Sequence, residues 1–146
     1  MEWSWYSVKT LYRTIALGNP KATDKYYDPE STMVEERVVL FRARSFREAI
    51  QKAEKDAKKY AGETNYCNPY GQKVKQRYLG MCDAFIIYDE PRAGVEVYSS
   101  TEIVGKNIRN KCIGNNRLGM ELTRVPDPRR KKFLNREFSG ALEKGA

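Results

Sequence analysis

Residues 44–62, RSFREAIQKAEKDAKKYAG, contain the most regular pattern in the chain and decide its fold. Ser45 and Glu48 have the spacing of a capping box, in which each side chain accepts a hydrogen bond from a backbone N–H at the start of a helix. Apolar residues then recur every three or four positions, as on one face of an amphipathic helix. Gly62 stands where a left-handed residue ends many helices. We therefore expect one helix here, and its core-facing residues are Phe46, Ala49, Ile50, Ala53, Ala57 and Tyr60.

Four other segments have the aromatic and β-branched composition of strands: residues 3–17, 35–44, 73–88 and 95–104. In the first, alternation places Tyr6, Val8, Thr10 and Tyr12 on one face. Gly80 inside the third indicates a bulge or bend. Residues 21–32 are read as a loop. The order strand, strand, helix, strand, strand, with a connection short enough for a hairpin within each pair, predicts an α+β fold: a four-stranded antiparallel sheet with one helix on one face.

The same segments carry a family resemblance. WYSVKTLYR, VEERVVLFRARSFREAIQKAEKDAKKYA, YLGMCDAFIIYDE and GVEVYSS, in this order, resemble a family of small bacterial α+β proteins known only as a domain of unknown function. The resemblance covers about residues 3–104. It implies an α+β architecture and no catalytic residues, so no active site is transferred to these positions.

Charge divides the chain at residue 105. The net charge of the 146 residues is +8, but residues 1–104 hold 16 Lys and Arg against 15 Asp and Glu, whereas residues 105–146 hold 11 against 4. We therefore expect a nearly neutral core domain, residues 1–104, followed by a basic C-terminal extension, residues 105–146. A short hairpin within residues 106–125 and a helix after Pro128 are expected in the extension.

Three interpretations of the extension stay open. Its cations form a patch that contacts phosphates, or they belong to a solvated arm, or its apolar residues fold back over the sheet. The phosphate-contacting candidates are Arg129, Arg130, Lys131, Lys132 and Arg136. No helix-turn-helix, zinc-finger or RNP pattern accompanies them, so nothing in the sequence predicts base recognition.

The face of the sheet that one helix cannot reach needs another cover, because both faces of the strands are partly apolar. The cover is the extension, a second copy or a different protein. Aromatic side chains suit a contact surface of this kind. The partner-binding candidates are Trp3, Trp5, Tyr12, Tyr78 and Tyr98.

Catalysis is not expected. The chain has no histidine, which removes the commonest general base and metal ligand, and its three cysteines are too few for a closed zinc site. Cross-strand pairing with basic residues explains the carboxylates that could otherwise form a metal or acid/base cluster. The carboxylates are Glu35, Glu36, Asp83, Glu96 and Glu102, and the basic residues are Arg37, Arg42, Arg44, Lys75 and Arg77. We expect no cofactor and no metal. Unpaired cysteines, no apolar run long enough for a bilayer and no signal-like N-terminus favour a cytoplasmic protein without membrane contact.

The sequence thus favours a non-catalytic binding protein. We expect it to bind a protein partner or a second copy through the sheet face, as an accessory or immunity-type component of a bacterial multi-protein system. The alternative is an accessory protein of RNA or DNA whose extension contacts phosphates.

Overall fold

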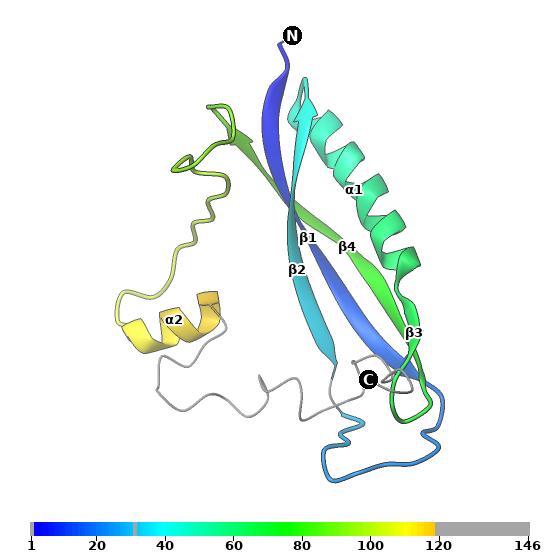
Figure 1. The fold of residues 1–146 in the computed structure, drawn as a ribbon. Helices are drawn as coiled ribbons and strands as arrows, with labels where there is room; N and C mark the ends of the chain where they lie inside the picture. The colour runs from blue at the N-terminus through cyan, green and yellow to red at the C-terminus, as the bar shows by residue number, and fades with distance from the viewer. Residues whose placement is uncertain (1, 31, 119–146) are drawn as a thin grey trace.

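The computed structural model describes residues 2–30 and 32–118. The elements follow in the order β1 (Ser4–Leu17), β2 (Met33–Ala43), α1 (Phe46–Glu63), β3 (Asn65–Cys67), β4 (Lys73–Ile87) and α2 (Asn110–Leu118). The four strands form one antiparallel sheet in the order β2-β1-β4-β3, and α1 packs against one face of it (Figure 1). The expected α+β class, the four-stranded antiparallel sheet and the helix on one face are confirmed.

The sheet is built around β1, which pairs with β2 over Ser4–Thr14 and with β4 over nearly its whole length. The prediction that one face of β1 carries Tyr6, Val8, Thr10 and Tyr12 is confirmed. This face is buried beneath α1. The ladder with β4 is interrupted between Thr10 and Tyr12, where extra residues of β4 bulge. Gly80 lies in this bulge with φ +75°, a conformation that favours glycine.

Helix α1 begins at the expected capping box. The Glu48 N–H donates to Ser45 Oγ at 3.1 Å, and Glu48 Oε2 accepts from the backbone N–H of Arg44 at 2.8 Å. Four alanines at intervals of four are buried, so the helix backbone lies close to the sheet and the large tyrosines of the strands fill the space between them. The buried alanines are Ala49, Ala53, Ala57 and Ala61.

The prediction for the end of α1 is wrong. The helix continues past Gly62 to Glu63 and ends on Thr64 in an extended conformation, with the Thr64 N–H donating to Ala61 O. Because β3 begins at the next residue, the chain needs an extended exit here rather than a left-handed turn.

The prediction of a strand at residues 95–104 is also wrong. This stretch forms no ladder, and the fourth strand is the short β3, which pairs with Lys73–Lys75 at the outer edge of β4. After β4 the chain passes over the sheet face opposite α1, where Tyr98 contacts Phe85 and Lys9. Because residues 95–104 lie across the face of the sheet and not beside an edge strand, their backbone has no strand with which to form a ladder.

The expected hairpin at residues 106–125 is contradicted where the structure describes it, because Asn110–Leu118 form α2. A two-stranded hairpin without a third layer is marginal in water, whereas a helix satisfies its own backbone. The expected loop is confirmed for residues 21–30, which contain no helix or strand. The helix expected after Pro128 lies outside the described residues.

Candidate protein-binding face

The sheet face opposite α1, called the open face below, carries a cluster of cations. Strand register places Arg13 opposite Arg77, Ile15 opposite Lys75, and Leu17 opposite Lys73. Alternation in β4 directs all three of its basic residues to this one face. The basic end of the open face comprises Arg13, Lys73, Lys75 and Arg77, among the apolar Leu11, Ile15, Leu17, Val34 and Leu79.

These four cations have no carboxylate partner within the described part of the chain, since none of its five ion pairs involves them. All four residues are exposed. The prediction that Lys75 and Arg77 form cross-strand ion pairs is wrong. Arg77 instead faces Arg13, and like charges directly opposite each other in a sheet are destabilising. The arrangement is suited to binding an anionic group from outside.

The adjoining edge strand, β2, adds exposed aliphatic side chains to the open face. Val34, Val38 and Leu40 are 57%, 44% and 40% exposed and alternate along the strand. Edge strands with exposed apolar residues are usually protected by charges or covered by another segment. On this face only Glu36 and Arg42 interrupt the apolar row, and Glu36 is paired with Lys9 at 3.4 Å.

Tyr98 covers part of the other end of the open face. Its hydroxyl donates to Asp83 at 2.7 Å, its ring lies 6.3 Å from that of Phe85, and the Lys9 ammonium is 4.7 Å from the ring centre. Burial and the hydrogen bond to Asp83 raise the pKa of Tyr98 to about 12. Tyr98 is therefore on the expected face, but it already fills a site within its own chain.

The two tryptophans lie at the N-terminal end of the sheet. Trp3 is 50% exposed, with the cations of Arg44 and Lys52 near its ring. Trp5 is half-buried, and its Nε1 donates to Glu90 at 2.7 Å. Both remain partly accessible, as a partner-binding role requires.

Tyr12 and Tyr78 are not on the open face, which corrects their assignment as contact residues. Tyr12 is fully buried, and its hydroxyl lies 2.7 Å from Thr10 Oγ1. Tyr78 packs against Tyr12 under α1, and burial raises its pKa to about 12. Strand alternation already placed Tyr12 together with Tyr6 and Val8, and that face is the core; the register of β4 sets Tyr78 opposite Tyr12.

Among the described residues, no group of three or more potential metal ligands is found. Glu35 accepts a hydrogen bond from the Tyr60 hydroxyl at 2.5 Å, and Asp56 pairs with Arg37 at 2.9 Å. Arg37 also stacks on the ring of Tyr60, 3.9 Å from its centre. This cluster joins α1 to β2, and its groups satisfy one another.

The phosphate-contacting candidates, Arg129 to Lys132 and Arg136, lie outside the described residues. The basic end of the open face was missed because its cations come from two distant strands. Its only sequence signal is the alternation of Lys73, Lys75 and Arg77.

Comparison with known proteins places this fold in a family. Residues 5–99 match the domain of unknown function DUF4288, a range that includes the sheet from the second residue of β1 onward, α1 and Tyr98. The chain belongs to the DUF4288 family. No curated protein and no solved structure matches it. The basic end of the open face therefore lies within the DUF4288 domain, while α2 follows it. In the described part of the chain, no helix has both the length and the apolar character needed to span a membrane.

Proposed function

We propose that this DUF4288 domain is a non-catalytic binding module whose open face docks a protein partner with an acidic, partly apolar surface. The observation that carries the proposal is the Arg13–Arg77 pair, two exposed like charges in direct register with no carboxylate within 4 Å in the described residues. A partner carboxylate between the two guanidiniums replaces repulsion with attraction.

The side chains around the cations favour a protein over a nucleic acid. They are aliphatic, and the five apolar residues of the basic end include no aromatic ring on which a base can stack. Aliphatic rows such as Val34, Val38 and Leu40 suit the apolar core of a protein interface, with the cations supplying orientation and specificity.

The test is site-specific photocrosslinking of the full chain in its native cells. A photoreactive residue replaces Val38 on the open face or, as the matched control, Lys59 on the exposed side of α1. We expect protein adducts of defined mass from position 38 only. We expect their loss when Arg13→Glu is added, because a carboxylate at that position occupies Arg77 from within the chain. Equal adduct patterns from both positions contradict the proposal.

The nucleic-acid alternative is tested in parallel by titrating generic RNA and DNA at about 50 and 200 mM salt. Phosphate contacts give an affinity that falls steeply between these concentrations. Binding of that kind, without protein adducts at position 38, replaces the proposal with the alternative.

A further inference from the structure

The outer edge of β4 is unpaired for most of its length. β3 covers only Lys73–Lys75, so the edge from Gln76 to Ile87 has no neighbouring strand in the described structure. Backbone N–H and C=O groups along such an edge are a template for an added strand.

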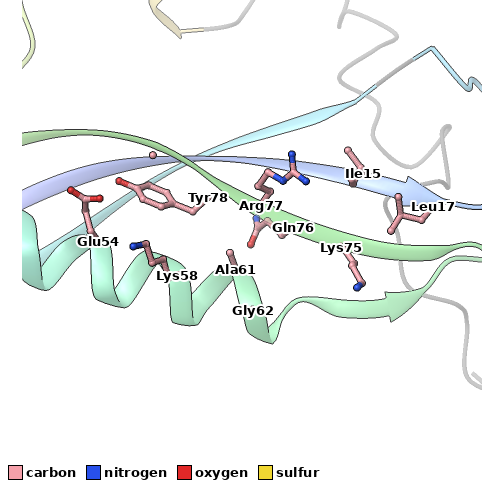
Figure 2. Close-up of a pocket in the computed structure, with 11 residues that line it drawn as sticks. Ile15, Leu17, Glu54, Lys58, Ala61, Gly62, Lys75, Gln76, Arg77 and Tyr78 are labelled. Carbon is pink, nitrogen blue, oxygen red and sulfur yellow. The ribbon is translucent and has the colours of Figure 1, made fainter.

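A groove runs between this edge and α1. It encloses about 710 Å³, with Ala61 and Gly62 of α1 on one side and Gln76 to Tyr78 of β4 on the other (Figure 2). Lys58, Lys75 and Arg77 also line it, against one carboxylate, Glu54. We call this the edge groove. It has the form of a strand-addition site with a cationic lining.

The chain also contains a segment with the complementary properties. Residues 99–104, SSTEIV, are exposed throughout and rich in strand-forming side chains, and Ile103 is fully exposed. In the described residues their backbone makes no hydrogen bond to another backbone group, and Ser100 O accepts only from Arg117. Glu102, the one charged residue of the segment, has an exposed ion pair with Arg117 at 3.4 Å, and such pairs contribute little.

We propose that residues 99–104 of one copy add as a strand in the edge groove of a second copy, and that the exchange is reciprocal. Six residues match a common strand length and fit within the free edge of β4. In this arrangement Tyr98 stays packed on the open face of its own copy, and residues 99–104, which follow it, extend to the second copy. Glu102 is then received by the cations of the groove. A reciprocal exchange closes into a two-fold dimer in which the β4 edge of each copy is covered.

The simplest alternative pairs two β4 edges with each other. Antiparallel pairing centred on the free edge Gln76–Ile87 sets Arg77 opposite Ile86 and offers it no carboxylate, whereas the added segment supplies Glu102 to the groove cations. The dimer shares Lys75 and Arg77 with the proposed function, but it forms without any other protein, so the mass measurement and the crosslinking test the two proposals separately.

The experiment measures the mass of the full chain by light scattering and sedimentation over a range of concentrations. We expect a dimer for the wild type. Arg77→Glu and Glu102→Lys should each weaken dimerisation about tenfold through like-charge contacts. Lys59→Glu and Glu96→Lys, on exposed sites outside both elements, are the matched controls.

An equimolar mixture of the Arg77→Glu and Glu102→Lys variants should restore a dimer. In the mixed pair, the charge-reversed groove of the first variant receives the charge-reversed segment of the second. The unaltered groove of the second variant receives the unaltered Glu102 of the first. Both contacts are then attractive, as in the wild type.

Ile103→Pro provides a second test, because it removes a ladder donor from a fully exposed position and leaves the core untouched. We expect a monomer with unchanged secondary structure. A wild type that stays monomeric at all concentrations, a dimer insensitive to Ile103→Pro, or a mixture that does not restore association each overturns the proposal. Loss of open-face crosslinks with the dimer intact contradicts only the proposed function.

Discussion

Arg13 of β1 and Arg77 of β4 face each other as register partners on the exposed face of the sheet, and neither has a carboxylate within 4 Å among the described residues. Two other basic residues of the strands have carboxylate partners: Arg37 pairs with Asp56, and Lys9 with Glu36. Cross-strand pairs contribute or cost roughly 0.2–1 kcal/mol, so the Arg–Arg pair is a small cost to the fold. A partner carboxylate bound at the proposed site offsets this cost.

Arg13→Glu should therefore stabilise the domain. It converts a like-charge pair into an opposite-charge pair, and we expect the free energy of unfolding to rise by about 0.5 kcal/mol. Urea denaturation at low salt measures the change. Lys59→Glu, which makes the same change in net charge on the exposed side of α1, is the control. A lower stability for Arg13→Glu than for the control contradicts this electrostatic reading.

Ala53→Leu should destabilise the helix–sheet packing. Ala53 is 1% exposed and contacts the cluster around Val8, so three further carbon atoms have no space without displacing α1. Overpacking of this kind costs about 1–3 kcal/mol. Urea denaturation measures it, and Gln51→Leu on the exposed side of α1 is the control. Equal stability of the two variants would show that α1 does not rely on small residues for its close approach.

Glu48 should make the stability of α1 depend on pH. The backbone N–H of Arg44 donates to its carboxylate and lowers the pKa of Glu48 below its ordinary 4.5, assisted by the Arg44 side chain. The charged form favours folding, so its contribution is present above pH 4.5 and is lost as pH falls through the lower pKa of the folded state. The stability difference between wild type and Glu48→Gln should follow this course in urea denaturation at stepped pH. Glu30→Gln, in the exposed loop, is the control, and a difference that persists at the lowest pH would exclude the carboxylate as its source.

Ser45→Ala should remove the other half of the cap. Ser45 Oγ accepts from the Glu48 N–H at 3.1 Å, and loss of such an N-cap costs about 1 kcal/mol. The cost should persist at low pH, because a hydroxyl does not titrate there. Thr23→Ala, at an exposed position of the loop without regular structure, is the control for urea denaturation. A loss that disappears in acid would show that the cap acts only through Glu48.

The parts of this fold that were predictable from sequence are those specified locally. The capping box, the alanine stripe and the alternation of Tyr6, Val8, Thr10 and Tyr12 each follow from one segment's periodicity, and each is confirmed. The strand expected at residues 95–104 failed for a non-local reason. Its composition is strand-forming, but ladder formation depends on which edge lies beside it, and Tyr98 holds the segment over a face.

The candidate site was less predictable than the fold. Arg13 and Arg77 lie on strands that are far apart in the chain, and their pairing depends on a register that is shifted by the bulge at Gly80. Counting residues along either strand gives the face of each arginine but not its partner. Tyr12 shows the opposite limit: its aromatic character suggested a contact surface, whereas its alternation with Val8 placed it in the core. Tyr78 joins it there through the register of β4 with β1.

Tyr98 should titrate near pH 12, well above an ordinary tyrosine. Burial beside Phe85 and the hydrogen bond to Asp83 favour the neutral phenol. Since the folded state raises this pKa, the contribution of Tyr98 to stability is complete below pH 10 and is lost as pH rises from about 10 to 12. The near-ultraviolet absorbance of phenolate, compared between wild type and Tyr98→Phe, should show one group titrating near pH 12.

Tyr88→Phe, which removes an 86% exposed phenol from the end of β4, is the control for the loss of one hydroxyl. A Tyr98 difference that titrates near pH 10 would show that residues 95–104 are not held on the open face. The segment proposed to enter a second molecule would then lack its anchor. A pKa near 12 would show that Tyr98 is anchored on the open face. Only the six residues 99–104, and not the whole stretch after β4, would then extend from this anchor toward the second molecule.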